Sequence, residues 1–331
     1  MKSATLALVL CAAIICGCTS QASVQQAAAD ARKAANQGAY KAEAADLNPV
    51  VDADSQDPQA YMARAYAYLE AGENQRAISD ATRAVELEPD AAFYLLARSL
   101  GYVRAGEFDR ALEDTNTAIQ LAPNAAGCWG QRGFVYMSMG DGRSAFADFT
   151  HAIKLDPNSV IYRVQRGFAL GMQGRYAEAQ RDWETAVRMR PDYGPSYSAL
   201  GWLQATCPDA KFRDAKKAVE NAKRGAKLGA PTMLAALVSG GAVASDVKPK
   251  PGQDRPALAW PLDALAAAYA EAGDFRQAVA VQQQAIACNR TTPNPLATKE
   301  QKLLALYQQK QPYRAGFDSV VPELPWISLP S

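Results

Sequence analysis

Small, apolar and aromatic residues recur along this chain at intervals of 34 residues, from Pro58 to Tyr193. Four copies of the unit follow one another without a gap. The recurring positions hold Gly72, Gly106, Gly140 and Gly174; Ala77, Ala111, Ala145 and Ala179; Ala84, Ala118, Ala152 and Ala186; Pro89, Pro123, Pro157 and Pro191; Ala65, Ser99, Gly133 and Gly167; and Tyr68, Tyr102, Tyr136 and Leu170. A period of this length indicates stacked copies of one small structural unit.

Each unit is predicted to contain two helices, which we call helix A and helix B. In the second unit we expect them at Tyr94–Ala105 and Phe108–Leu121. The recurring glycine follows helix A, where a residue with positive φ is easily accommodated. The recurring proline follows helix B, because its ring fixes φ and cannot continue a helix. An Ala-rich composition with few β-branched runs also favours an all-α protein.

The 34-residue spacing, with small residues where helices must approach and proline just past a helix end, resembles the tetratricopeptide repeat. The resemblance extends from about Pro58 to Arg290 and implies an all-α, right-handed α-solenoid of helix-turn-helix repeats. The stretches 203–214 and 262–275, with the ending Pro312-Tyr313-Arg314, resemble a C-terminal repeat pair common in bacterial tetratricopeptide proteins.

The 331-residue chain is predicted to divide into eight segments. They are a lipoprotein signal peptide (1–17), a tether with a degenerate first helical pair (18–57), four regular repeats (58–193), a fifth repeat with an enlarged turn (194–228), an insertion rich in Gly, Pro and Lys (229–258), a sixth repeat (259–290), a C-terminal capping helix (291–314) and a Pro-rich tail (315–331). Terminal repeats are commonly atypical because their outer face meets water.

The N-terminus has the pattern of an export signal. Lys2 precedes an apolar stretch, Leu6 to Ile15, that is too short to span a bilayer. The sequence Cys16-Gly17-Cys18 that follows resembles the bacterial lipoprotein box, which implies that Cys18 becomes the acylated, palmitate-bearing first residue. Thr19 then implies an outer-membrane lipoprotein facing the periplasm, if the cell has an outer membrane. The alternative is an ordinary cleaved signal.

Two charged positions recur in step with the repeat. Arginine occupies one slot of helix A and aspartate one slot of helix B, at Arg64, Arg98, Arg132 and Arg166 and at Asp80, Asp114, Asp148 and Asp182. Where the arginine slot becomes Leu200 or Leu265, the aspartate slot becomes Asn221 or Val281. Charges that appear and disappear together predict structural ion pairs linking the two helices, within or between repeats. A row of anion-binding sites is the functional alternative.

The tetratricopeptide resemblance implies that helix A lines a concave groove. The side chains expected there are mostly apolar and aromatic, and we predict a peptide-binding groove made by Tyr66, Phe93, Leu96, Leu100, Phe134, Met137, Val164, Phe168 and Trp202. Part of this set is expected to pack against the next repeat. The groove suits an apolar or amphipathic segment, and it lacks the Lys and Asn set of a carboxylate clamp.

Composition and motifs argue against most other functions. The 35 basic and 34 acidic side chains give no electrostatic case for nucleic acid. The chain contains one histidine, His151, which we expect on the surface. Most acid–base and metal chemistry would therefore lack the residue that it usually employs. No phosphate loop, dinucleotide fingerprint, HExxH or paired CxxC is present. We therefore expect no enzymatic activity, no metal and no cofactor.

Cys128, Cys207 and Cys288 are expected to be buried thiols. Packed helices lie ~8–10 Å apart, whereas a disulfide requires Cα atoms within ~7 Å. A less favoured hypothesis places an enzyme or small-ligand site at Cys207 or at Gly127 and Gly130, which leave room between larger neighbours.

The sequence as a whole predicts a lipid-anchored envelope scaffold that binds other proteins in its concave groove. The alternative is a structural protein that uses the same groove to bind a second copy of itself. Neither the repeat pattern nor the groove composition names the partner.

Overall fold

The computed structural model describes residue 47 and residues 56–229, 259–288 and 295–314 of the chain. Within these residues the structure consists of α-helices and one short 3-10 helix, without strands. The predicted signal peptide, most of the 18–57 segment, the insertion from residue 230 onward and the 315–331 tail lie outside the described residues, so these predictions remain predictions.

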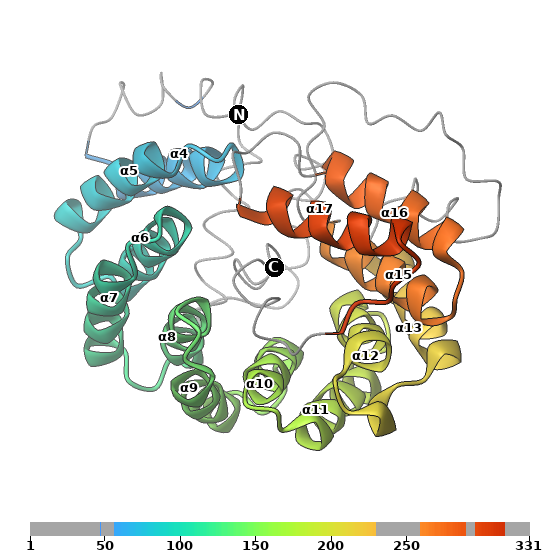
Figure 1. The fold of residues 1–331 in the computed structure, drawn as a ribbon. Coiled ribbons are helices and arrows are strands. Elements are labelled where there is room, and N and C mark those ends of the chain that lie inside the picture. The colour runs from blue at the N-terminus through green and yellow to red at the C-terminus, as the bar shows by residue number, and fades with distance from the viewer. Residues whose placement is uncertain (1–46, 48–55, 230–258, 289–294, 315–331) are drawn as a thin grey trace. The chain divides into compact units, whose positions relative to one another are not determined.

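The helices occur as successive A–B pairs joined by short turns (Figure 1). The first three pairs are α4 (Pro58–Glu70) and α5 (Asn74–Leu87), α6 (Ala92–Ala105) and α7 (Phe108–Leu121), and α8 (Ala126–Ser138) and α9 (Gly142–Leu155). The next are α10 (Val160–Met172) and α11 (Tyr176–Met189), and α12 (Gly194–Thr206) and α13 (Ala215–Gly229), separated by the 3-10 helix η1 (Ala210–Phe212). The last three helices are α15 (Ala259–Glu271), α16 (Phe275–Cys288) and α17 (Pro295–Gln308).

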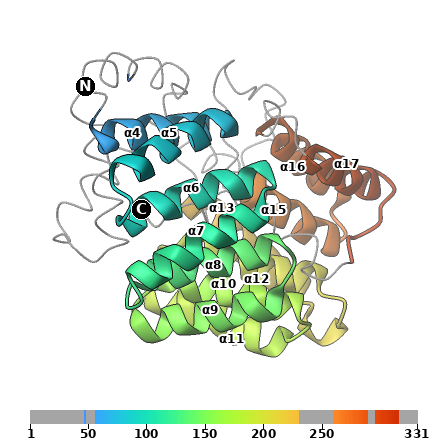
Figure 2. The same cartoon turned by 90° about the vertical axis from the view of Figure 1, so that its left-hand side faces the viewer.

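The described residues form two compact units. The first comprises residues 47, 56–139 and 147–157, and the second comprises 140–146, 158–229, 259–288 and 295–314. Helix α9 contributes residues to both units. Within the first unit, α4 lies along α5 and α6 lies along α7 (Figure 2).

The ends of the helices agree closely with the predicted elements. Helix α7 has the expected bounds, whereas α6 begins at Ala92, two residues earlier than predicted. Gly106 ends α6 with φ of +78°, and its N–H donates to backbone carbonyls of the last turn. The equivalent glycines of the other regular repeats also have positive φ, which confirms the predicted role of this position.

The C-terminal capping segment contains one helix followed by a non-helical ending. Helix α17 ends at Gln308, and residues 311–314, which include Pro312-Tyr313-Arg314, are not helical. Lys310 has φ of +56°, so the backbone leaves the helical conformation two residues after the last helical turn. The segment that follows packs against α12 and α15, as described below.

In the third and fourth repeats a glycine of helix A lies directly against an aromatic side chain of helix B. A Cβ built on Gly133 would lie 2.9 Å from Phe149, and one built on Gly167 would lie 2.4 Å from the indole of Trp183. Both aromatic side chains are fully buried. These two glycines are therefore required by close packing, because protein interiors leave no space for an additional methyl group there.

The helix A position of this contact is small in all four regular repeats, whereas the helix B position varies in size. From the first repeat to the fourth, the pairs are Ala65 with Ala81, Ser99 with Thr115, Gly133 with Phe149, and Gly167 with Trp183. Glycine stands on helix A in the two repeats whose helix B residue is aromatic. A large helix B residue therefore goes with the smallest possible helix A residue.

Candidate functional site

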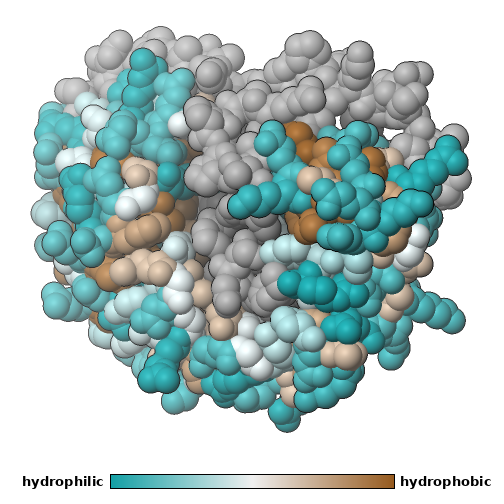
Figure 3. All heavy atoms as spheres, in the orientation of Figure 1, coloured by the Kyte–Doolittle hydropathy of each residue, from teal (hydrophilic) through white to brown (hydrophobic). Residues whose placement is uncertain are grey.

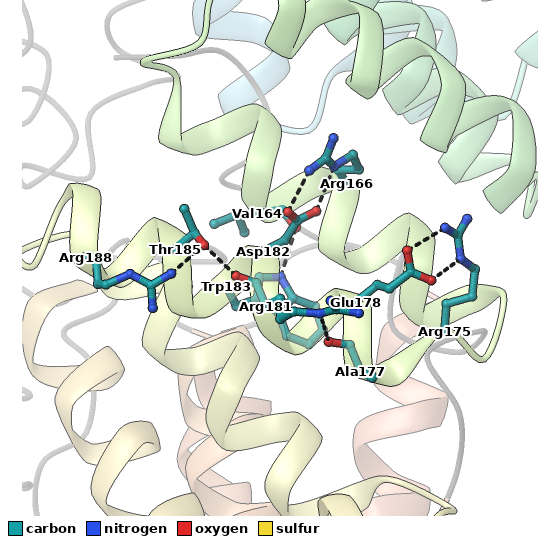
Figure 4. Close-up of polar contacts among 10 residues, drawn as sticks. All are labelled: Val164, Arg166, Arg175, Ala177, Glu178, Arg181, Asp182, Trp183, Thr185 and Arg188. Atoms are coloured by element: carbon teal, nitrogen blue, oxygen red, sulfur yellow. Dashed lines mark hydrogen bonds and ion pairs between the residues drawn. The ribbon is translucent and has the colours of Figure 1, made fainter.

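Each predicted Arg–Asp pair is brought together within its own repeat, 16 residues apart, as Figure 4 shows for Arg166 and Asp182. In every pair the arginine Nε donates to Oδ2 and Nη2 donates to Oδ1 of the aspartate. The two distances are 2.7 and 2.7 Å for Arg64–Asp80, 2.8 and 2.6 Å for Arg98–Asp114, 2.8 and 2.8 Å for Arg132–Asp148, and 2.7 and 2.7 Å for Arg166–Asp182. Such two-pronged contacts fix both distance and orientation.

These ion pairs are largely buried. Only 18% of the Arg98 side chain and 7% of the Asp114 side chain are exposed. Burial raises the pKa of the Asp114 carboxyl, and the hydrogen bonds from Arg98 act in the opposite direction. The same hydrogen bonds raise the pKa of the Arg98 guanidinium. Asp114 therefore depends on Arg98 for its charged form.

Aromatic rings extend these contacts along the helices. The guanidinium of Arg98 lies 5.8 Å from the centre of the Tyr102 ring, and that of Arg110 on α7 lies 4.2 Å from it. Tyr68 and Tyr136 occupy the same position beside their own arginines. This cation–π contact gives a physical reason for the recurring tyrosine, which the sequence pattern alone did not explain.

The fourth repeat replaces this tyrosine by leucine and recovers the ring from another helix. Leu170 stands at the tyrosine position, and Phe146 of α9 lies 6.0 Å from Arg166 and 4.5 Å from Arg175. An aromatic ring between two arginines is thus retained although its source along the chain has changed.

Later repeats link the two helices with uncharged or differently placed groups. In the fifth repeat, Asn221 Nδ2 donates to Gln204 Oε1 at 2.9 Å. In the sixth, Leu265 and Val281 are buried, and Gln282 Nε2 donates to Asp263 Oδ1 at 2.8 Å. Because the aspartates fill the arginine forks in the first four repeats and the charges are absent afterwards, the arrangement is that of a structural contact.

In the first unit the predicted groove residues lie on α4, α6 and α8, and most are covered. Leu96, Leu100 and Met137 are nearly or fully buried. Tyr66 and Phe134 are 7% and 6% exposed, and Phe93 alone among the predicted groove residues is half-buried. The rings of Tyr66 and Phe93 are 6.4 Å apart across α4 and α6. Hydrophobic residues gather over α6 in the space-filling view (Figure 3).

In the second unit the predicted groove residues Val164, Phe168 and Trp202 are fully or almost fully buried. The chain itself covers the two aromatic residues. Trp260 of α15 lies 5.9 Å from Phe168 and 4.9 Å from Trp202, and Tyr313 lies 5.8 Å from Trp202. The sequence analysis did not predict that Trp260 and Tyr313 cover Trp202. The ending Pro312-Tyr313-Arg314 was the signal in the sequence that could have indicated a role for Tyr313.

Arg314 fastens the covering segment to the helices below it. Its Nη1 donates to the carbonyl oxygen of Ala205 at 3.2 Å, and its Nη2 pairs with the carboxylate of Glu271. Arg213, in the enlarged turn after α12, approaches the same carboxylate at 3.5 Å. The last described residues of the second unit thus contact both α12 and α15, and Arg213 and Arg314 share the Glu271 carboxylate.

The residues considered as candidates for catalysis or ligand binding are buried or half-buried among packed side chains. Cys207 is fully buried, and burial raises the pKa of its thiol, which opposes formation of a reactive thiolate. Cys128 is also buried. His151 is half-buried with its ring centre 4.0 Å from that of Trp129, so it is less exposed than expected. Gly127 is half-buried and Gly130 is buried.

Among the residues that the structure describes, no group of three or more His, Cys, Asp or Glu side chains could hold a metal ion. No helix in the described part of the chain combines the length and apolar character needed to cross a membrane.

Comparisons with known proteins identify the repeat. The profile of the tetratricopeptide repeat matches residues 58–91 and 126–159. A solved tetratricopeptide repeat protein from Parabacteroides merdae is 16% identical with a TM-score of 0.56, and the match covers 82% of this chain and 93% of that one. A chain of the APC/C hetero-tetramer Cut9–Hcn1 is 14% identical with a TM-score of 0.60, covering 87% of this chain and 49% of the other. No curated protein matches the sequence.

The chain therefore contains tetratricopeptide repeats, and its fold is the all-α solenoid of helix-turn-helix units that the sequence predicted. At these levels of identity the solved structures support the fold alone. Proteins with this repeat are generally non-enzymatic scaffolds for protein interaction.

Replacing Arg98 by leucine should leave the buried Asp114 carboxylate without its partner. We expect the free energy of unfolding to fall by about 3–5 kcal/mol. The double variant Arg98→Leu/Asp114→Val reproduces the pairing of Leu265 with Val281 and should lose less than Arg98→Leu alone. Urea unfolding followed by circular dichroism measures both losses. Equal or greater loss in the double variant would show that the two side chains do not act as a pair.

Proposed function

We propose that this protein is a non-enzymatic scaffold that binds other proteins through the helix A surface of its repeats. The presence of tetratricopeptide repeats carries this proposal, because proteins with this repeat generally serve that purpose. The buried Cys207 and the ion-paired arginines support a non-enzymatic role, since neither is available for chemistry on a substrate.

The first unit is the better candidate for the binding surface. In the second unit, Trp260 and Tyr313 already contact the aromatic residues expected to bind a peptide. In the first unit, Phe93 is half-buried beside Tyr66, and hydrophobic residues gather over α6 (Figure 3). An apolar or amphipathic segment with one aromatic or aliphatic residue against Phe93 fits this surface.

Site-specific photo-crosslinking tests this surface in cells. The full chain carrying p-benzoylphenylalanine in place of Phe93 should give a discrete adduct with a different protein. Leu121, which is 40% exposed at the end of helix α7, is the matched control position and should not give that adduct. The same adduct from both positions, or none from position 93, would contradict the proposed surface. An adduct containing only a second copy of the chain would favour the self-associating alternative.

We further propose that the scaffold is a lipoprotein of the bacterial envelope, held through Cys18 and facing the periplasm, in an outer membrane if the cell has one. The apolar stretch Leu6–Ile15 followed by Cys16-Gly17-Cys18 supports this placement. Cys18 lies outside the described residues, so the proposal rests on the sequence.

Metabolic labelling with an alkyne fatty acid tests the lipid anchor. The native chain expressed in a bacterium should incorporate the label, and the Cys18→Ser variant should lose it completely, because the serine cannot accept the thioether-linked lipid. Intact mass spectrometry of the purified protein then locates the new N-terminus. An unlabelled native chain cleaved at another site would identify an ordinary secretion signal instead.

A further inference from the structure

The near-neutral total charge of the chain conceals a steady gradient along the repeats. Residues 58–91 carry six acidic and three basic side chains, a net charge of −3. The next three repeats have net charges of −1, 0 and +2, and residues 194–229 carry three acidic and seven basic side chains, a net charge of +4. The first and fifth repeats therefore have opposite charges.

Most of the positive charge of the fifth repeat lies on the outer side of α13. Lys216, Arg224 and Lys227 are exposed, and Lys223 is half-buried beside them. The opposite side of the helix is buried through Ala218, Ala222 and Ala226. We call the four basic side chains the α13 basic face.

The α13 basic face differs from the arginines of the earlier repeats in having no acidic partner. In residues 58–193, arginines of every repeat form ion pairs with aspartate or glutamate. By contrast, no carboxylate of the described residues pairs with Lys216, Lys223, Arg224 or Lys227; Lys223 and Arg224 instead lie over the rings of Tyr269 and Tyr197. The exposed Glu220 lies among these four residues on the same helix face, so the α13 basic face keeps a net charge of +3.

The first repeat has an exposed acidic surface at the corresponding end of its helix B. Glu86, Glu88 and Asp90 are exposed at and just beyond the C-terminal end of α5, and we call them the α5 acidic face. Arg83 pairs with Glu86 at 3.0 Å and offsets one of these charges. When Asp80 is aligned with Asn221, Glu86 corresponds to Lys227, so equivalent outer positions carry opposite charges in the two repeats.

We infer that the α13 basic face binds the α5 acidic face of a second copy of this chain. Charge complementarity selects this occupant, because the same sequence supplies both surfaces and each keeps a net charge, +3 on the α13 basic face after Glu220 is counted and −2 on the α5 acidic face after Arg83 is counted. Two different surfaces meeting in this way form a head-to-tail contact, which builds rings or open chains of molecules. The inference is separate from the proposed scaffold function, which uses the helix A surface.

Sedimentation of the full chain at two salt concentrations tests the contact. At about 0.01 M salt, where the Debye length is ~30 Å, we expect the weight-average mass to rise with protein concentration above that of the 35.5 kDa monomer. At about 1 M salt, where the Debye length is ~3 Å, the mass should return to that of the monomer.

Charge reversal identifies the surfaces that meet. Reversing the α13 basic face (Lys216→Glu, Lys223→Glu, Arg224→Glu and Lys227→Glu) and reversing the α5 acidic face (Glu86→Lys, Glu88→Lys and Asp90→Lys) should each abolish self-association. Mixing the two variants should restore it, because each then presents the charge that the other lacks. Arg143→Glu/Lys154→Glu, at exposed positions of the neutral third repeat, is the control and should associate like the parent. Thermal melts of all variants establish that each is folded.

Three outcomes would overturn the inference. These are a parent chain that stays monomeric at low salt, assembly that survives both reversals, and mixed variants that fail to associate although each is folded. Binding to phosphatidylglycerol vesicles by a monomeric parent, lost on reversing the α13 basic face, would assign this face to an anionic lipid surface instead. Crosslinking at position 93 reports independently on the scaffold function.

Discussion

Each regular repeat depends on one contact between its two helices, made of two adjacent residue pairs. In the fourth repeat, Arg166 and Asp182 form the ion pair (Figure 4), and the next residue of each helix, Gly167 and Trp183, forms the second pair. The ion pair fixes the register of helix A on helix B, and the glycine makes room for the indole of Trp183. Stacking of repeats follows from this geometry, because a repeat buries its remaining apolar surface against its neighbours.

Different residues preserve this contact in different repeats. The carbonyl oxygen of Leu96 accepts a hydrogen bond from Ser99 Oγ at 2.7 Å, and the equivalent carbonyl of Val164 accepts one from Trp183 Nε1 at 3.0 Å. A small hydroxyl on helix A and a large indole on helix B thus serve the same acceptor. In the sixth repeat, a buried apolar pair and a nearby Gln282–Asp263 hydrogen bond replace the ion pair. The geometry is retained while the chemistry changes.

The sequence predicted the features that recur at fixed short intervals, and it missed contacts between residues far apart along the chain. The period, the helix ends and the coupling of arginine to aspartate were visible because they recur at fixed intervals. The contact of Arg314 with Ala205 spans 109 residues and belongs to no periodic pattern. For the same reason, the pattern did not reveal that Trp260 and Tyr313 cover Trp202. Total charge was also uninformative, since the opposite charges of the first and fifth repeats partly cancel in the sum.

The central claim is that a large helix B residue at this contact requires glycine at the facing helix A position. Thermal unfolding of a transplanted pair tests it most directly, by moving the glycine and tryptophan of the fourth repeat into the second. Thr115→Trp alone should destabilise the chain by about 1–3 kcal/mol through overpacking. Adding Ser99→Gly should recover at least half of that loss, because it makes room for the indole and frees the Leu96 carbonyl to accept its N–H. A double variant no more stable than Thr115→Trp would contradict the account.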